Sequence, residues 1–228
     1  MAEKEPKAVQ CIGLILDGNR RWARERDLHT LEGHAKGFDL IKDTARWVRA
    51  RNIPHMVFYG FSTENWGRAK EEVSYLMDLF RKLINETAEE LHKEGVRIRF
   101  VGQRERFDQD LREGMDRIEE MTKDNTRLTV WACLSYGGRA EIVHAANRAA
   151  AEGDITEESI QKHLWTAGMP DPDIIVRTSG EQRLSGFLTW QGVYSELFFI
   201  KSHWPDFSEA TLDEILAEYA ERERRHGK

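Results

Sequence analysis

The feature that most constrains the fold is an alternation, along nearly the whole chain, between short apolar runs and long segments with helical periodicity. The short runs are predicted to be strands and span 11–16, 55–61, 97–102, 128–134, 173–177 and 197–200. The long segments repeat apolar residues every three or four positions and are predicted to be helices at 35–51, 70–94, 104–123, 138–152, 157–164 and 209–224. This alternation predicts an α/β domain with a largely parallel central sheet flanked by helices.

The composition fits one folded domain. The chain has 228 residues, of which 40% are hydrophobic and 32% charged, so it can bury one sizeable core. Neither a repeat nor a linker interrupts the pattern, so residues 1–10 are expected to form a flexible tail and residues 11–228 a single domain. The formal net charge of −6 lacks the basic excess of a general nucleic-acid binder, and no nucleic-acid partner is expected.

The two cysteines and the hydropathy pattern bear on the cellular compartment. Cys11 and Cys133 lie in apolar runs and are interpreted as buried thiols of a reduced, cytoplasmic protein. No apolar run approaches the roughly 20 residues of a membrane span, and the first ten residues lack a signal-peptide core. We therefore expect a cytoplasmic protein whose membrane contact, where it occurs, is peripheral and serves product release.

Polar clusters follow four of the predicted strands. They are DGNRRW at 17–22, STENWGR at 62–68, SYGGR at 135–139 and RTSGEQRLS at 177–185. Because ligands of parallel α/β sheets bind beyond the carboxyl ends of the strands, the four clusters are expected to meet at one rim. That rim would combine arginines, small hydroxyls, glycine turns and a lone carboxylate.

This combination of residues is typical of anion binding. Arginine guanidinium groups and backbone N–H groups suit phosphate oxygens, and one carboxylate among them can hold Mg²⁺ together with substrate phosphates. The rim is therefore predicted to bind a diphosphate or triphosphate. The alternative is that Asp17 caps a helix and the arginines form surface ion pairs. The nucleotide loops G-x-x-x-x-G-K-[ST] and G-x-G-x-x-G do not occur.

The second helical segment has the clearest apolar face. Its members are Val73, Leu76, Met77, Phe80, Leu83, Ile84, Ala88 and Leu91. Their spacing predicts one side of a helix packed against the sheet or, alternatively, one wall of an apolar tunnel. Periodicity does not separate the two.

In several long motifs the sequence resembles the cis-prenyltransferases, and most closely the bacterial enzymes that make undecaprenyl diphosphate. The motifs are DGNRRWA at 17–23, EGHAKG at 32–37, FSTENWGR at 61–68, EEVSYLMDLF at 71–80, SYGGRAEIV at 135–143, DPDIIVRTSGEQRLSGFLTWQ at 171–191, YSELFF at 194–199, WPDF at 204–207 and RERRHG at 222–227. They occur in the family's order from about Ile12 onward. Because the family's growing product needs an apolar channel, the resemblance brings back the tunnel as a possible role of the apolar face beside core packing.

The resemblance implies roles for particular residues. Asp17 would hold Mg²⁺ together with Glu196, and Asp17 and Asn65 would be catalytic, the latter as proton acceptor or organiser of the condensing substrate. Substrate-binding residues would be Gly18, Asn19, Arg20, Arg21, Trp22 and His34 around the allylic primer, Ser62, Thr63, Glu64, Trp66 and Arg68 from FSTENWGR, and Arg177, Arg183, Leu184 and Ser185 around isopentenyl diphosphate.

The implied activity is a Mg²⁺-dependent condensation of isopentenyl diphosphate with an allylic primer, expected to be farnesyl diphosphate. The product would be a long-chain polyprenyl diphosphate, undecaprenyl diphosphate for a cell-wall carrier lipid, and the small Gly60 favours that length. The end of the chain resembles a family tail that reaches a neighbouring active site, which implies a homodimer with Arg225 and Gly227 in that role. The alternative for the tail is a frayed basic helix end.

Four positions depart from the family pattern. Thr30 stands where an arginine of the primer site is usual, Gly186 and Ser135 replace asparagines, and Ala69 replaces a proline. The departures leave open a second product class, short or branched. A non-catalytic partner subunit is a third interpretation, and a nucleotide-binding regulator a distant fourth.

Overall fold

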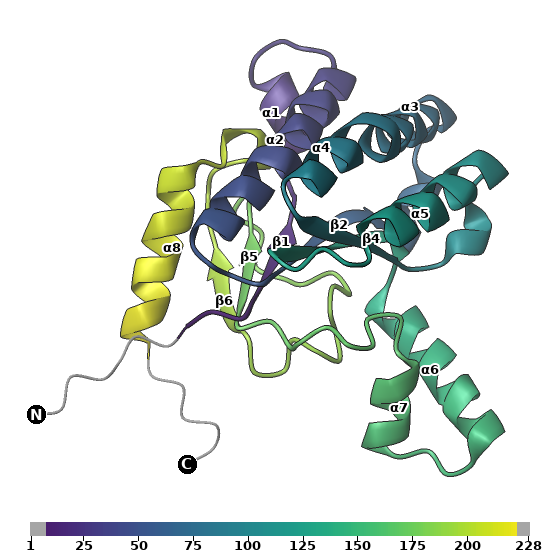
Figure 1. Ribbon diagram of the computed structural model, residues 1–228. Coiled ribbons are helices and arrows are strands. Elements are labelled where there is room, and N and C mark those ends of the chain that lie inside the picture. The colour runs from purple at the N-terminus through teal and green to yellow at the C-terminus, as the bar shows by residue number, and fades with distance from the viewer. Residues whose placement is uncertain (1–7, 223–228) are drawn as a thin grey trace, which may run out of the picture.

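The central element of the fold is a six-stranded, entirely parallel sheet. The computed structural model describes residues 8–222. The strands are β1 (Cys11–Ile15), β2 (His55–Ser62), β3 (Val96–Val101), β4 (Leu128–Tyr136), β5 (Ile174–Arg177) and β6 (Glu196–Phe199), in the order β3-β4-β2-β1-β5-β6 (Figure 1). The predicted α/β fold with a parallel sheet is confirmed.

Helices cover one face of this sheet. They are α2 (Thr30–Ala50), α3 (Lys70–Lys82), α4 (Ala88–Lys93), α5 (Gln109–Thr122) and α8 (Glu209–Glu221). Their apolar sides meet alternate residues of the strands, such as Leu14, Phe58 and Val176, in the larger core. Strand side chains alternate between faces, so the intervening residues point to the opposite side.

Among residues 8–222, the opposite face has a smaller core and no comparable helical layer. Val57, Cys133 and Ile175 of the strands pack there against Met169, Phe187 and their neighbours from the irregular segments 164–173 and 178–195, which flank β5. Helices α6 (Gly138–Glu152) and α7 (Glu157–His163) form a hairpin that projects away from the sheet (Figure 1). Helices therefore flank the sheet mainly on one side.

Several boundaries differ from the predicted ones. A short helix, α1 (Asn19–Arg24), was not predicted, because its six residues are too few for a periodic signal. Helix α2 begins at Thr30 rather than at residue 35, since His29 and Glu32 form a capping box in which the imidazole takes the place of the usual small polar side chain. The predicted helix 70–94 contains a π-helical turn, Leu83–Thr87, between α3 and α4.

The ends of the described chain bear on the predicted tail. Val9 packs against the larger core and Gln10 donates its backbone N–H to Asp173, so these two residues are tied to the sheet. Residues 1–7 of the predicted tail lie outside the described residues, as do residues 223–224 of the last predicted helix. Among residues 8–222, no helix is long and apolar enough to cross a membrane.

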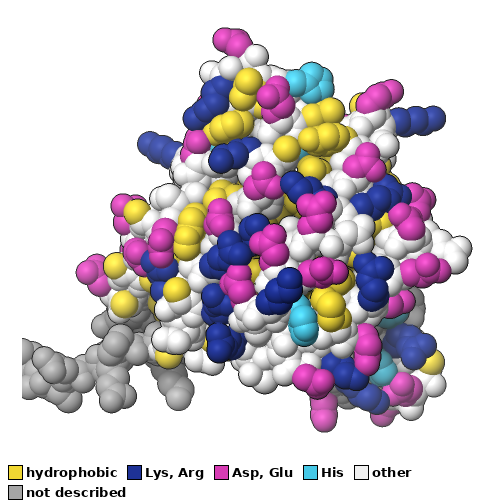
Figure 2. Space-filling view, turned by 45° about the horizontal axis from the view of Figure 1, so that its top comes forward, with side chains coloured by type: hydrophobic (Ala, Val, Ile, Leu, Met, Phe, Trp, Pro, Cys, Tyr) yellow, Lys and Arg dark blue, Asp and Glu magenta, His cyan; other side chains and the backbone are white. Residues whose placement is uncertain are grey.

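The exposed surface carries charges of both signs. Figure 2 shows Lys and Arg interspersed with Asp and Glu over the face that it displays. Many of these side chains are paired, as in the contacts of Arg81 with Asp78, Asp108 and Asp110. Pairs of this exposed kind contribute little to stability.

Two glycines explain the EGHAKG motif. Helices α1 and α2 lie side by side, and a Cβ at Gly33 would lie 2.0 Å from the backbone oxygen of Asn19. A Cβ at Gly37 would lie 2.3 Å from Asn19 Oδ1. The absence of side chains at these two positions lets the backbone of α1 rest directly on α2, which fixes α1 next to the end of β1.

We expect Gly33→Ala to lower the free energy of unfolding by about 2 kcal/mol, because the added methyl group has no room beside Asn19. Urea unfolding followed by circular dichroism measures the effect. Gly67→Ala is the matched control, since a Cβ there meets no atom within 4 Å. Equal unfolding free energies for the two variants would contradict the close approach of α1 to α2.

Candidate active site

A cavity of about 780 Å³ opens at the carboxyl ends of four adjacent strands, β4, β2, β1 and β5. Residues from all four predicted polar clusters line it, so the predicted convergence at one rim is confirmed. The predicted site residues in the lining are Asp17, Asn19, His34, Ser62, Thr63, Glu64, Asn65, Arg68, Arg177 and Ser185. The volume falls in the range of small-molecule sites.

An ion pair between Asp17 and Arg177 joins the first and last clusters. Arg177 Nη2 donates to Asp17 Oδ2 at 2.8 Å, and Arg21 Nη2 lies 3.2 Å from Asp17 Oδ1. Burial acts to raise the pKa of Asp17, but the hydrogen bond and charge of Arg177, followed by those of Arg21, outweigh it and lower that pKa. The carboxylate is therefore ionised at neutral pH and lies in the cavity wall between two cations.

Arg177 also organises the loop that follows it. Its Nη1 donates to the backbone oxygen of Arg183 at 2.5 Å and to Ser185 Oγ at 2.8 Å. The guanidinium is almost fully buried, and its Nε has no hydrogen-bond partner among the described residues. One side chain thus fixes both the carboxylate at the end of β1 and the serine of the RTSGEQRLS segment.

A second charged cluster surrounds Glu72 and reaches the cavity lining through His34 and Arg68. His34 Nε2 lies 3.0 Å from Glu72 Oε1, Arg68 Nη1 donates to the same oxygen at 3.0 Å, and Arg20 Nη1 lies 3.9 Å from Oε2. Burial is the main reason that the pKa of His34 is lowered, against the opposing effect of Glu72. His34 is therefore neutral at pH 7.

Glu72 was missed as a site residue by the sequence prediction. It lies in the first turn of α3, four residues after Arg68, but Arg68 has an extended backbone outside the helix, so the helical i, i+4 spacing does not mark this pair. The glutamate sits between the two arginines and the histidine and holds all three side chains beside the cavity.

The 3₁₀ turn after β2 (Thr63–Gly67) places the residues of the FSTENWGR motif. Asn65 Oδ1 accepts the backbone N–H of Ser62 at 3.0 Å, so this carboxamide stabilises its own turn. Trp66 turns away from the cavity, where its Nε1 donates to Ser135 Oγ at 2.9 Å and its ring packs on Phe61 and Phe107.

Several predicted residues lie beside the cavity rather than in its lining. Gly18 caps α1, and Trp22 points toward Asp206, to which its Nε1 donates at 2.6 Å. Arg183 is exposed and pairs with Glu181, and Leu184 packs on the smaller core. Gly18, Arg20, Arg21, Trp22, Trp66, Arg183, Leu184 and Glu196 are the predicted residues outside the lining.

Glu196 lies far from Asp17 within one chain. It begins β6 in register with Ile174 at the start of β5, whereas Asp17 follows the end of β1. Glu196 pairs instead with Arg222 at 3.0 Å. The predicted two-carboxylate metal site is therefore not assembled by a single chain, and within residues 8–222 no three His, Cys, Asp or Glu side chains form a metal-binding group. Arg225 and Gly227 lie outside the described residues.

The donor set at Asp17 fits one mode of magnesium binding. Mg²⁺ commonly takes one or two carboxylates and completes its shell with water and substrate phosphates. Asp17 offers one ionised carboxylate in the cavity lining, 27% exposed, with cations beside it that suit phosphates.

Two of the departures from the family pattern have a conformational explanation. Ser135 has φ 49° and Gly186 has φ +79°, both in the left-handed region. Asparagine is one of the few non-glycine residues that favour this region. Glycine at position 186 is free of strain, and no atom lies closer than 4.0 Å to a Cβ built there. Thr30 begins α2 and does not line the cavity.

The apolar face of the second helical segment lies in the larger core. Leu76, Met77, Phe80, Leu83 and Ile84 are all buried there. Of the eight residues on the predicted face, Leu76 alone lines the cavity. The structure thus confirms core packing for the face as a whole, with one residue at the cavity wall.

Another feature missed by the sequence prediction is a buried carboxylate behind the rim. Glu141 is fully buried and accepts hydrogen bonds from Tyr136 Oη, from Thr166 N and Oγ1, and from Gln191 Nε2 at 2.5–3.0 Å. Burial, followed by the negative charge of Glu141, raises the pKa of Tyr136 well above its usual range. Glu141 lies in the SYGGRAEIV motif, but its role was not predicted, because two of its partners, Thr166 and Gln191, are 25 and 50 residues away in the sequence.

This network stabilises the segment that carries Ser185. Gln191 anchors one end of it, while Tyr59 Oη donates to the backbone oxygens of Tyr136 and Ser185, and Gly138 N donates to the oxygen of Gly186. Tyr59 also lines the cavity and stacks on Phe187. Burial raises the pKa of Tyr59, so it stays a neutral donor.

We expect Glu141→Ala to lower the free energy of unfolding by about 3 kcal/mol, because it leaves buried donors of Tyr136, Thr166 and Gln191 unpaired. Chemical denaturation at pH 7 measures the loss. Glu152→Ala on the same helix removes the contacts of an exposed carboxylate with Lys162 and His163 and should change the unfolding free energy by less than about 0.5 kcal/mol. A similar small change for both variants would show that the network is unimportant for stability.

Comparison with known proteins agrees with this geometry. Residues 15–227 match the family model described as "Putative undecaprenyl diphosphate synthase". An isoprenyl transferase of Chromobacterium violaceum is 44% identical over 95% of this chain and 87% of its own, and one of Thermotoga maritima is 41% identical over 96% of both.

Solved structures lead to the same family. Lavandulyl diphosphate synthase from Lavandula x intermedia, in complex with dimethylallyl diphosphate, superposes with a TM-score of 0.93 at 30% identity, covering 97% of this chain and 99% of that one. A probable undecaprenyl diphosphate synthase from Campylobacter jejuni superposes with a TM-score of 0.85 at 30% identity, over 97% and 100%. The chain belongs to the undecaprenyl diphosphate synthase family of isoprenyl transferases.

Proposed function

We propose that the protein condenses isopentenyl diphosphate with an allylic diphosphate primer, farnesyl diphosphate, and repeats the step to build a long-chain polyprenyl diphosphate. The observation that carries the proposal is the rim itself. The ionised carboxylate of Asp17 contacts Arg177 and Arg21, and Arg68, which pairs with Glu72 beside Arg20, lines the same cavity. Cations at these two places suit two diphosphates bound side by side.

The cations have a direct role in the proposed chemistry. As the allylic carbon–oxygen bond breaks, negative charge grows on the departing diphosphate, and guanidinium groups fixed in advance stabilise it. The double bond of isopentenyl diphosphate then attacks the allylic carbon, and loss of a proton from the adduct gives the new double bond. We propose Asn65 and the neutral imidazole of His34, two uncharged polar side chains in the cavity lining, as the groups that accept this proton.

Magnesium is proposed as the cofactor, with Asp17 as its ligand from this chain. The ion would supply additional positive charge to the leaving diphosphate. Asp17 Oδ1 and Oδ2 each have a guanidinium partner, so the carboxylate is held in a fixed orientation toward the cavity. Glu196 would join such a site only from a second copy of the chain, in a homodimer to which Arg225 and Gly227 also contribute.

The proposed product is undecaprenyl diphosphate for a cell-wall carrier lipid. The description of the matching family model and the name of the C. jejuni structure support a polyprenyl product. The protein is proposed to act in the cytoplasm, with peripheral membrane contact at product release.

A short or branched product is the second candidate, favoured by one observation. The cavity reaches Leu76 and no deeper residue of the apolar face, which leaves little described space for a long tail. The high similarity to lavandulyl diphosphate synthase also agrees with a smaller product. A non-catalytic subunit is disfavoured, because Asp17, Arg177 and Ser185 all meet at the cavity.

Product analysis distinguishes these candidates. Purified protein is incubated with Mg²⁺, farnesyl diphosphate and radiolabelled isopentenyl diphosphate, and products are separated by chain length after removal of the diphosphate. A ladder ending near eleven isoprene units supports the long-chain proposal. A short or branched product supports the second candidate, and no incorporation with farnesyl, geranyl or dimethylallyl diphosphate overturns both.

We expect Asp17→Asn to fold normally and to lose about a thousandfold in kcat, because the amide keeps the shape but not the charge at the rim. Initial rates of isopentenyl incorporation measure the loss, and circular dichroism checks the fold. Asp154→Asn, an exposed residue after α6, is the matched control and should retain wild-type turnover. Near-normal turnover in Asp17→Asn would contradict the proposed mechanism.

A further inference from the structure

His203 packs against the turn that follows β1. Its Nδ1 lies 2.6 Å from Ser179 Oγ, and its Nε2 lies 2.9 Å from Glu25 Oε1. The imidazole is 14% exposed, and it lies in the short connection between β6 and the last 3₁₀ turn (Trp204–Asp206). Neither His203 nor Ser179 lines the cavity.

The chemistry of the partners fixes the direction of these hydrogen bonds. An ionised carboxylate only accepts, so Nε2 carries the hydrogen that is donated to Glu25. In the neutral imidazole Nδ1 is then an acceptor, and the hydroxyl of Ser179 donates to it. The chain Ser179–His203–Glu25 is therefore directional and fully paired.

The imidazole contacts both ends of helix α1. Gly18 caps its start with φ 105°, and a Cβ built there would lie 2.6 Å from His203 Nδ1 and 2.7 Å from Ser179 Oγ. Glu25 is the residue that caps the end of α1. His203 thus lies against the residues that cap α1 at its start and at its end, Gly18 and Glu25.

Ser179 adopts a backbone conformation that serine seldom has. Its φ is 76°, in the left-handed region that non-glycine residues seldom adopt. Its N–H donates to the oxygen of Ser202 at 2.8 Å, and its own oxygen accepts from Arg21 Nη1 at 3.3 Å. The strained residue thereby presents its hydroxyl to His203 and its carbonyl to an arginine of the rim.

The neighbouring contacts hold Asp17 in the same way. The backbone oxygen of Asp17 accepts from Thr178 Oγ1 at 2.6 Å and from Trp204 N at 3.0 Å. The turn from Asp17 to Asn19 therefore packs between the residues that follow β5 and those that follow β6. Of the atoms around Gly18, His203 Nδ1 would lie nearest to a Cβ built there.

We propose that His203 is a positioning residue for the allylic diphosphate: through Ser179 and Glu25 it sets the turn at Gly18 and helix α1, which carries Asn19, Arg20 and Arg21. The inference rests on the proposed function and names a residue that sets primer affinity. The hydrogen bonds of Arg177 with Ser185 and of Gln191 with Glu141, which hold the proposed isopentenyl diphosphate site, do not include His203.

The experiment compares binding and turnover in four variants with Mg²⁺ present. They are His203→Ala, Ser179→Ala, the double variant, and His203→Asn, whose side-chain oxygen can still accept from the hydroxyl of Ser179. The dissociation constant of farnesyl S-thiolodiphosphate, a primer analogue that ionises poorly, is measured by calorimetry. The KM for isopentenyl diphosphate and kcat are measured in parallel, and thermal unfolding confirms that each variant is folded.

We expect Ser179→Ala to weaken binding of the analogue by about tenfold, the effect of one lost hydrogen bond, and His203→Ala, which also loses its contact with Glu25, by at least tenfold. The double variant should bind no more weakly than His203→Ala, because that variant has already lost the hydrogen bond of Ser179. His203→Asn should bind within about threefold of wild type, and the KM for isopentenyl diphosphate should change less than about twofold in every variant.

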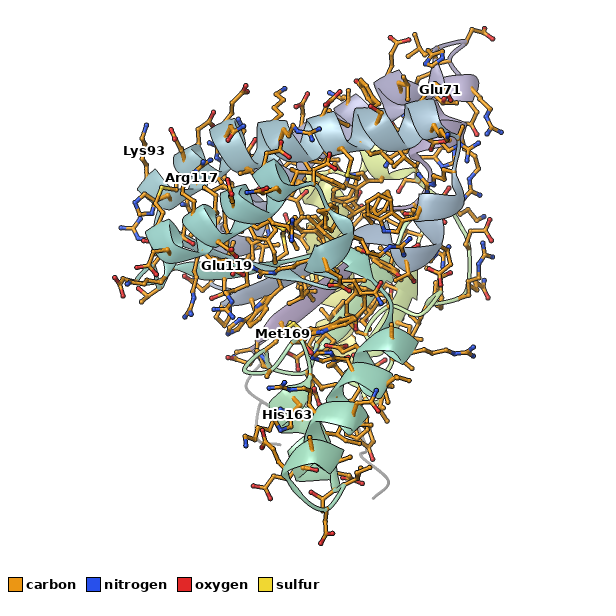
Figure 3. The ribbon with its side chains drawn as sticks, turned by 90° about the vertical axis from the view of Figure 1, so that its right-hand side faces the viewer. Glu71, Lys93, Arg117, Glu119, His163 and Met169 are labelled. Carbon is orange, nitrogen blue, oxygen red and sulfur yellow. The ribbon has the colours of Figure 1, made fainter. Side chains whose placement is uncertain are left out.

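His163→Ala is the matched control. His163 forms a similar pair with Glu152 at 3.1 Å, and Figure 3 shows it on the α6–α7 hairpin, well away from Glu71 at the start of α3. It should leave both constants unchanged.

Four outcomes would count against the inference or the function beneath it. Unchanged analogue binding in His203→Ala, or an equal weakening of both substrates, would overturn the positioning role. Additive losses in the double variant would also overturn it. If wild-type protein neither binds the analogue nor incorporates isopentenyl diphosphate, the proposed function fails, and the inference fails with it.

Discussion

The ion pair between Arg177 and Asp17 is the contact on which the rest of the site depends. Arg177 lies at the end of β5 and Asp17 just beyond the end of β1, two strands that are neighbours in the sheet. The guanidinium is almost fully buried, so its charge is stabilised by the carboxylate and by the oxygens of Arg183 and Ser185. Its position fixes the carboxylate and the RTSGEQRLS loop at once, and the remaining cations are arranged around this pair.

Sheet topology explains why such a pair can form. With β1 between β2 and β5, the polar segments after four strands emerge side by side, while the larger core on the helical face stays dry. The smaller core and the Glu141 network hold the irregular segment whose tip carries Ser185. These buried contacts hold the loops at the rim in fixed positions, and an enzyme that stabilises charge needs groups fixed in advance.

The sequence predicted the layout of this site well and its supporting contacts poorly. The ends of strands are marked by local composition, so Asp17, Ser62 and Arg177 were expected at one rim and lie there. Neither Glu72 nor Glu141 is marked by spacing, since Arg68 lies outside α3 and two partners of Glu141 are 25 and 50 residues away. Helix α1 was missed because its six residues are too few for a periodic signal. Glu196 was assigned to the metal site by its motif, although it starts a strand rather than following one.

We propose that the rim of one chain binds two diphosphates at the same time, on either side of Asp17. The most direct test of this proposal is calorimetric titration of isopentenyl diphosphate into protein already saturated with farnesyl S-thiolodiphosphate and Mg²⁺, with Arg177→Lys as comparison. We expect one molecule of isopentenyl diphosphate to bind per chain in this titration. In Arg177→Lys this binding step should be much weaker, because lysine cannot replace the forked contacts of arginine. Mutually exclusive binding of the two ligands would contradict the proposal.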